Sequence, residues 1–211
     1  MSLPRPFPAL YCIVDAPRFG SLAQMLLFCR ECVAGGASLI QYRNKSGKSG
    51  EMLSHARELH RIAGPGVMLI MNDRADLCLG AALDGVHLGQ DDLSPLAARR
   101  LVGERIVGLS THTVEQVRAA DAAHCDYIAI GPVFSTTSKQ NPDPVIGTAG
   151  VKAARAATRK PLVAIGGITR SNCREVMAAG ADSVAVISDL LINPREAVRG
   201  FLSLLGSVSP A

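Results

Sequence analysis

The chain has 211 residues, of which 48% are hydrophobic and 19% are charged, and its formal net charge is +4. This length fits one large domain or two small ones, and it is sufficient to bury a substantial core. The basic residues are dispersed and aromatic residues make up only 4% of the chain, which argues against nucleic acid as a partner and favours a small anionic ligand.

No segment is apolar over the length of a signal peptide or a membrane span, and residues 1–8, which contain three prolines, read as an N-terminal extension. We therefore expect a cytoplasmic protein without membrane contact. The six cysteines mostly lie in apolar periodic segments, which predicts reduced core residues. Cys29 and Cys32 have redox or zinc spacing, but they fall within a predicted helix without a second cysteine pair. A core role is favoured for both.

From residue 10 the sequence repeats one pattern, in which a short apolar strand is followed by a turn and an amphipathic helix. Strands are predicted at 10–14, 38–41, 67–71, 85–87, 105–109, 126–130, 162–165 and 183–187. Helices are predicted at 22–34, 50–62, 73–79, 94–101, 113–122, 148–157, 170–178 and 193–204.

Apolar strands that alternate with helices indicate a parallel sheet, because each crossover helix returns the chain to the same edge. Eight such units predict an α/β fold of the (β/α)8, or TIM-barrel, class, although such barrels usually need about 250 residues. A doubly wound open sheet is the alternative, but the turn at 15–20 lacks the glycine-rich pattern expected there. No linker interrupts the sequence, so residues 1–211 are predicted to form a single domain.

The barrel predicts that functional residues gather where the strands end, since the loops leaving the strands form the active face. Polar residues do follow these predicted strands. They are Gln41, Arg43 and Lys45 after the second, Asn72 and Asp73 after the third, Gln90, Asp91 and Asp92 after the fourth, Ser110 and His112 after the fifth, and Ser188 after the eighth. Among the histidines only His112 is placed at this rim, where a supporting hydrogen bond is the usual role.

Alternate residues of an extended segment point to the same side, so Gln41, Arg43 and Lys45 can face one space together. Arginine supplies a planar fork and lysine a point charge, a combination suited to a diphosphate. A solvated basic loop is the alternative interpretation.

Asp73 and Asp92 follow adjacent strands, so their carboxylates can share one cation. Magnesium commonly binds through one or two carboxylates together with substrate phosphates and water. Each aspartate, including Asp91, has an alternative role as a helix cap.

Two further segments suit phosphate. The loop after the sixth strand offers hydroxyls and a mobile cation, in Ser135, Thr136, Thr137, Ser138 and Lys139, although such loops are also common as solvated turns. Gly166 and Gly167, with Ile187 and Ser188, resemble the backbone cradle that many barrels build after strands 7 and 8. The sequence thus predicts two phosphorylated ligands side by side.

These residues together resemble the thiamine-phosphate synthase family over positions 11–188. The resemblance rests on the motifs Gln41-Tyr42-Arg43-Asn44-Lys45, Asn72-Asp73-Arg74, His87-Leu88-Gly89-Gln90-Asp91-Asp92, Gly108-Leu109-Ser110-Thr111-His112, Gly131-Pro132-Val133-Phe134, Lys139 and Ala164-Ile165-Gly166-Gly167-Ile168. It implies a magnesium-dependent transferase of thiamine biosynthesis that joins an aminomethylpyrimidine diphosphate to a thiazole phosphate. The products would be thiamine phosphate and pyrophosphate.

The resemblance also implies residue roles. The pyrimidine diphosphate would be held by Gln41, Arg43, Lys45, Asn72 and Lys139, with Mg²⁺ on Asp73 and Asp92 and the pyrimidine against Ser110. Arg43, Ser110 and Lys139 would be the catalytic residues. The thiazole phosphate would be bound by Thr136, Ser138, Gly166, Ile187 and Ser188. One departure is visible, because the family usually has threonine where this chain has Ser138.

No nucleophile or strong base is evident, so catalysis is expected to depend on position and electrostatics. A related thiazole tautomerase, in which His112 would move protons, and a non-catalytic phosphate-binding regulator of the same pathway are the alternatives. Retention of both the basic set and the two aspartates favours the synthase. A homo-oligomer is compatible with the sequence, which leaves the oligomeric state open.

Overall fold

The computed structural model describes residues 6–136 and 143–206. Within them eight parallel strands close into a barrel in chain order, with β8 paired to β1. The strands are β1 (Leu10–Asp15), β2 (Leu39–Arg43), β3 (Met68–Asn72), β4 (Gly85–Leu88), β5 (Ile106–Thr111), β6 (Tyr127–Ile130), β7 (Leu162–Ile165) and β8 (Ser183–Val186). The predicted TIM barrel is confirmed.

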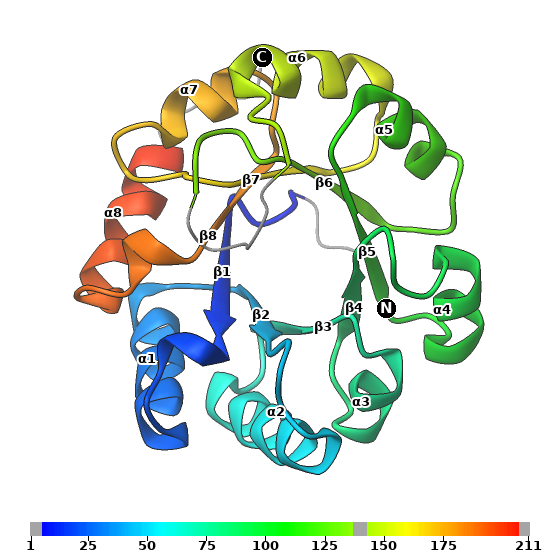
Figure 1. Cartoon of the computed structure of the whole chain (residues 1–211). Coiled ribbons are helices and arrows are strands. Elements are labelled where there is room, and N and C mark those ends of the chain that lie inside the picture. The colour runs from blue at the N-terminus through cyan, green and yellow to red at the C-terminus, as the bar shows by residue number, and fades with distance from the viewer. Residues whose placement is uncertain (1–5, 137–142, 207–211) are drawn as a thin grey trace.

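Helices follow the strands and form a ring around the barrel (Figure 1). They are α1 (Leu22–Gly35), α2 (Ser49–Ala63), α3 (Ala75–Gly80), α4 (Pro95–Val102), α5 (Val114–Asp121), α6 (Gly147–Ala157), α7 (Cys173–Ala178) and α8 (Pro194–Gly206). Two short 3-10 helices, η1 (Ala16–Arg18) and η2 (Ser188–Leu190), were not predicted from the sequence. No helix in the described residues is long and apolar enough to cross a membrane.

Several element boundaries differ from the predicted ones, and the differences matter for the site. Arg43, Asn72 and Ser110 were expected just beyond their strands, but each belongs to the strand itself. The reason is that the neighbouring strands continue far enough to pair with them, for example in the register Asp15 to Arg43 and Asn72 to His87. Strand backbone therefore fixes these polar side chains more firmly than loops would.

Two helices begin two or more residues later than predicted. The segment 73–74 does not start α3, because Asp73 has a φ of 62°, which lies in the left-handed region and cannot continue a right-handed helix. Residues 170–172 form a turn before α7, in which the Thr169 amide donates to the side chain of Asn172 at 2.8 Å.

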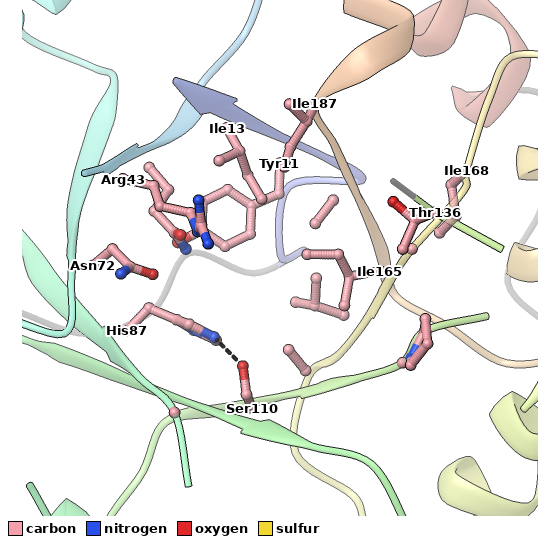
Figure 2. Close-up of a pocket in the computed structure, with 18 of the residues that line it drawn as sticks. Tyr11, Ile13, Arg43, Asn72, His87, Ser110, Thr136, Ile165, Ile168 and Ile187 are labelled. Atoms are coloured by element: carbon pink, nitrogen blue, oxygen red, sulfur yellow. Dashed lines mark hydrogen bonds between the residues drawn. The ribbon is translucent and has the colours of Figure 1, made fainter. Parts of the chain in front are cut away.

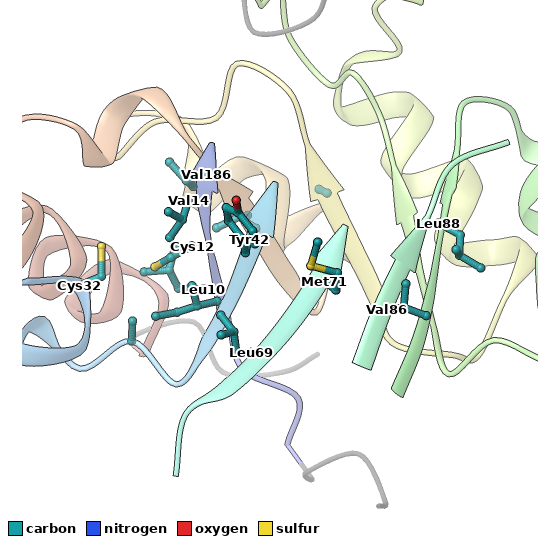
Figure 3. Close-up of a cluster of buried hydrophobic side chains, with 14 of the residues drawn as sticks. Leu10, Cys12, Val14, Cys32, Tyr42, Leu69, Met71, Val86, Leu88 and Val186 are labelled. Carbon is teal, nitrogen blue, oxygen red and sulfur yellow. The ribbon is translucent and has the colours of Figure 1, made fainter. Parts of the chain in front are cut away.

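The alternation of side chains along the strands divides the core into two layers. On β1, Leu10, Cys12 and Val14 pack outward against the helices, as Figure 3 shows with Cys32 of α1 facing them. Tyr11 and Ile13 point inward and join a smaller cluster that fills the barrel. All six cysteines are free and buried, and burial raises the pKa of Cys29 to about 12, which agrees with a core role.

The inner layer contains a tyrosine that depends on one glycine. Tyr127 on β6 is fully buried, and its ring occupies the space beside Gly108 on β5. A Cβ atom at position 108 would lie 2.1 Å from Cζ of Tyr127. This contact is far inside van der Waals distance, so only glycine fits there without a rearrangement of the barrel interior.

We predict that Gly108→Ala lowers the free energy of unfolding by about 1–3 kcal/mol, the usual cost of overpacking a core. Gly50→Ala is the matched control, because nothing lies within 4 Å of a Cβ at that helical position. Alanine is favoured over glycine in helices, so this variant should be neutral or slightly more stable. Denaturant unfolding of both variants tests the prediction, and equal stabilities would show that Tyr127 can move at little cost.

Candidate active site

A cavity of about 530 Å³ opens where the strands end, and residues of all eight strands and of the loops after them line it. The predicted residues Gln41, Arg43, Lys45, Asn72, Asp73, Asp92, Ser110, Thr136, Gly166, Ile187 and Ser188 all line this cavity. Figure 2 shows Arg43 and Asn72 on one side and Thr136 and Ile168 on the other. Ser138 and Lys139 lie outside the described residues. The structure thus gathers the predicted site residues that it describes.

The alternation predicted for β2 is confirmed. Gln41 and Arg43 line the cavity, whereas Tyr42 between them is buried in the outer core layer. Nη1 of Arg43 lies 2.5 Å from Oδ1 of Asp15, a carboxylate at the end of β1 that is only 3% exposed. Asp15 was missed by sequence reasoning, although its place opposite Arg43 in the strand register could have identified it. This ion pair holds the guanidinium at the cavity wall with further donors available.

Lys45, Asp73 and Asp92 form a cluster of charges at the rim. Nζ of Lys45 lies 2.5 Å from Oδ2 of Asp73, and Oδ2 of Asp92 accepts from the backbone amide of Gly89 at 2.7 Å. Burial and a hydrogen bond with Asp92 raise the pKa of Asp73, while Lys45 opposes the shift. Asp73 thus lies between one cation, Lys45, and a second carboxylate, Asp92.

The alternative role of these aspartates as helix caps is wrong. The N-cap of α3 is Arg74, and α4 is capped by Ser94, whose hydroxyl accepts from the amide of Ala97. No cluster of three or more potential metal ligands occurs among residues 6–136 and 143–206. A pair of adjacent carboxylates that face a cavity fits Mg²⁺, which completes its coordination with substrate phosphate and water.

Asn72 presents an unpaired donor to the same side of the cavity. Asn72 is 8% exposed, and its Nδ2 atom is buried without a hydrogen-bond partner among the described residues. A buried amide donor without a partner carries a desolvation cost that a ligand acceptor would relieve. This geometry suits the predicted role of Asn72 toward a phosphate or pyrimidine atom.

Below the charged rim, a chain of hydrogen bonds runs through the barrel interior. Tyr11, Tyr127 and His87 form its centre, Gln41 lies at one end, and Ser110 lies at the other with its Oγ 2.8 Å from Nε2 of His87 (Figure 2). Burial lowers the pKa of His87 to about 4, so the ring is neutral near pH 7. Sequence reasoning did not count His87 as a site residue, but it also lines the cavity, below the rim where His112 lies.

Gly166 and Gly167 lie on the opposite side, with φ values of 104° and 63°. A Cβ on Gly166 would come within 2.6 Å of Pro132, because the loop after β6 crosses it closely. The Phe134 amide donates to the Gly166 carbonyl at 3.0 Å. These glycines are therefore required by the packing of two loops as well as by the approach of a ligand.

Ser188 begins η2, and the next residue, Asp189, accepts hydrogen bonds from the amide and the guanidinium of Arg170 at 3.0 and 2.9 Å. This ion pair ties the loop after β7 to the loop after β8. His112 fastens a third loop, since its Nδ1 lies 2.6 Å from the Gly131 carbonyl and its Nε2 lies 3.5 Å from Asp143. Both interactions are structural supports at the rim of the cavity.

Comparison with known proteins places the whole barrel in one family. The model of the thiamine monophosphate synthase family matches residues 10–190. A thiamine-phosphate synthase of Koribacter versatilis is 59% identical over 204 residues, covering 95% of this chain and 97% of the relative, and one of Chloroflexus aurantiacus is 43% identical over 157 residues, covering 74% and 73%.

Among solved structures, thiamine phosphate pyrophosphorylase from Pyrococcus furiosus superposes with a TM-score of 0.86 at 30% identity, covering 96% of this chain and 97% of that one. The match extends over every strand of the barrel and over the residues that line the cavity up to position 190. This chain belongs to the thiamine monophosphate synthase family.

Proposed function

We propose that this protein acts as a thiamine-phosphate synthase, transferring the aminomethylpyrimidine group of a pyrimidine diphosphate to a thiazole phosphate. The observation that carries the proposal is the division of one cavity into two unlike halves. Cations, carboxylates and an unpaired amide occupy the side formed by β2, β3 and β4. Glycines and a serine occupy the side formed by β7 and β8. Two phosphorylated substrates fit such a cavity, with their reacting ends meeting at its centre.

The diphosphate would bind on the charged side. Arg43, oriented by Asp15, has further N–H groups that can donate to phosphate oxygens. Lys45 can exchange its hydrogen bond with Asp73 for one with the ligand. Asp73 and Asp92 would hold Mg²⁺, which when bound supplies positive charge for the pyrophosphate that leaves. Lys139, which lies outside the described residues, stays a predicted partner of the same group.

The pyrimidine would lie deeper, between Gln41 and Ser110, on apolar and aromatic side chains of the inner layer. The thiazole phosphate would be held by backbone amides near Gly166 and Ser188, with Thr136 beside it. In this proposed arrangement the thiazole nitrogen would approach the pyrimidine methylene carbon.

The chemistry requires no protein nucleophile. The bond between the methylene carbon and the diphosphate oxygen breaks, and its electron pair leaves with pyrophosphate. The aminopyrimidine ring delocalises the positive charge left on the methylene, and the lone pair of the thiazole nitrogen then forms the new carbon–nitrogen bond. The residues of this site contribute position and charge stabilisation, which suit such a reaction.

We predict that the purified chain forms thiamine phosphate from the two phosphorylated substrates in the presence of Mg²⁺, and that EDTA abolishes turnover. Chromatographic detection of thiamine phosphate and pyrophosphate tests this directly. Conversion of the thiazole tautomer without coupling would support the tautomerase instead. Binding of both phosphates without either reaction would support a regulator.

Asp73→Asn and Asp92→Asn should each lower kcat by about 100-fold at fixed Mg²⁺, because each removes a carboxylate from the proposed metal site. Part of the loss should be recovered at higher Mg²⁺ concentration. Asp76→Asn is the matched control, since this exposed carboxylate pairs with Arg74 on α3 and does not line the cavity. A loss that is equal in all three variants would exclude a specific metal role.

Asn72→Ala should change the free energy of unfolding by less than about 1 kcal/mol, because the buried amide nitrogen makes no hydrogen bond that can be lost. The KM for the pyrimidine diphosphate should nevertheless rise, since the proposed ligand contact is removed. Thr111→Val is the control, because its hydroxyl donates to the Ala129 carbonyl at 2.8 Å and its loss should destabilise the fold. Substantial unfolding of Asn72→Ala with unchanged KM would make Asn72 structural.

A further inference from the structure

A single line of hydrogen bonds crosses the barrel interior below the cavity and joins five strands. Nε2 of Gln41 donates to the Tyr11 hydroxyl at 2.9 Å, and this hydroxyl lies 2.9 Å from that of Tyr127. The Tyr127 hydroxyl lies 2.8 Å from Nδ1 of His87, and Nε2 of His87 lies 2.8 Å from Oγ of Ser110. Both ends of the line, Gln41 and Ser110, face the cavity.

The protons that each group carries decide which group donates and which accepts at every hydrogen bond of this line. The amide nitrogen of Gln41 only donates, so the Tyr11 oxygen accepts there, and the proton of Tyr11 needs an acceptor elsewhere. Among the described residues its remaining polar partner is the Tyr127 hydroxyl. Tyr127 therefore accepts from Tyr11 and donates its own proton to Nδ1 of His87.

If every hydrogen bond of the line ran in the opposite direction, the same geometry would leave one proton without an acceptor. If His87 carried its proton on Nδ1, Tyr127 would accept that proton and donate to Tyr11. Tyr11 would then accept two hydrogen bonds, and its own proton would have no acceptor among the described residues at a position that is 1% exposed. Burial raises the pKa of both tyrosines, so neither phenol releases its proton to relieve the conflict.

The direction decides what Ser110 offers to a ligand. With the ring proton of His87 on Nε2, Oγ of Ser110 accepts it, and the hydroxyl proton of Ser110 is left to point into the cavity. Among the described residues this proton has no acceptor, so it is available to a ligand in the cavity that Ser110 lines. An aromatic ring nitrogen with a free lone pair accepts such a proton, as carbonyl and phosphate oxygens also do, and the proposed pyrimidine substrate carries ring nitrogens of this kind.

We propose that Tyr11, Tyr127 and His87 are positioning residues that hold the Ser110 hydroxyl as a hydrogen-bond donor aimed at an acceptor nitrogen of the pyrimidine ring. The inference rests on the proposed function for the identity of the ligand. The direction of the line and the tautomer of His87 follow from the protein alone.

Packing keeps the line in place. The rings of His87 and Tyr127 stack with centroids 5.5 Å apart, and Tyr11 meets Tyr127 edge to face at 6.0 Å. Gly108 leaves the space that the Tyr127 ring occupies. Tyr11 and Tyr127 are 1% and 0% exposed and His87 is 7% exposed, so close packing restricts the movement of all three side chains.

The tautomer is measured first, on the full chain labelled with 15N-histidine at neutral pH and without substrates. The His87 signals are assigned by their loss in His87→Asn. We expect the shift of Nε2 to be that of a protonated ring nitrogen and the shift of Nδ1 to be that of an unprotonated one. Protonation on Nδ1 would mean that the Gln41 carbonyl faces Tyr11, and it would overturn the proposal, as would a doubly protonated ring.

A double-mutant cycle then tests whether Tyr127 acts through Ser110. Tyr127→Phe should lower kcat/KM by about tenfold in the native chain, the effect of roughly one lost hydrogen bond. In a Ser110→Ala chain the same change should have little effect, because the hydroxyl that Tyr127 orients is gone. Equal losses in both chains would make Tyr127 merely structural and overturn the proposal.

Tyr42→Phe is the matched control, because this buried tyrosine lies in the outer core layer and its hydroxyl contacts His55 instead. It should leave kcat/KM unchanged. Thermal unfolding of each variant confirms the fold, and if Tyr127→Phe does not fold, Tyr11→Phe breaks the same line one step earlier. Absence of coupling activity together with a proton on Nε2 would refute the proposed function and still support the direction of the line.

Discussion

Closure of β8 onto β1 is the constraint on which the rest of this structure depends. The pairs Leu10 to Val184 and Cys12 to Val186 complete the ring of parallel strands, so no strand edge is left open. Closure also forces every second side chain of each strand into one shared interior. Residues as distant in sequence as Tyr11 and Tyr127 come within 2.9 Å only because of this geometry. The cavity is therefore a consequence of the strand register.

Two ion pairs at the rim bring cations and carboxylates together before a ligand binds. Two unit charges about 4 Å apart interact by roughly 4 kcal/mol near a protein surface, so cations and carboxylates at one rim cannot stand alone. Asp15 forms an ion pair with Arg43, and Lys45 forms one with Asp73. The two ion pairs differ in mobility. Asp15 is buried and fixes its partner, whereas Lys45 is half exposed and can move. The pair of Asp15 and Arg43 fixes the geometry of the site, and the pair of Lys45 and Asp73 is able to rearrange when phosphate and metal bind.

Much of this fold could be predicted from the sequence, since strand and helix patterns alternate eight times and polar residues follow the strands. What could not be predicted was the exact end of most strands, since only β6 and β7 end at the predicted residue. Arg43 looks like a loop residue by itself, and only pairing with Asp15 extends the strand to include it. Tyr11, His87 and Tyr127 were missed because they lie within apolar strands, where a single tyrosine or histidine usually reads as core. Their hydrogen bonds become visible only when the strand register brings the hydroxyls and the ring together.

The barrel interior thus combines two requirements that normally compete. Stability favours a close-packed apolar filling, and Ile13, Leu39, Ile70, Ile106 and Val163 provide it. Function requires polar atoms under the cavity, and burying them is costly unless each finds a partner. The line from Gln41 to Ser110 satisfies this condition with aromatic residues, which fill volume with their rings and carry a hydrogen bond at their edge. Such a line tolerates little change, because removal of one hydroxyl leaves the next polar group without its partner at a buried position.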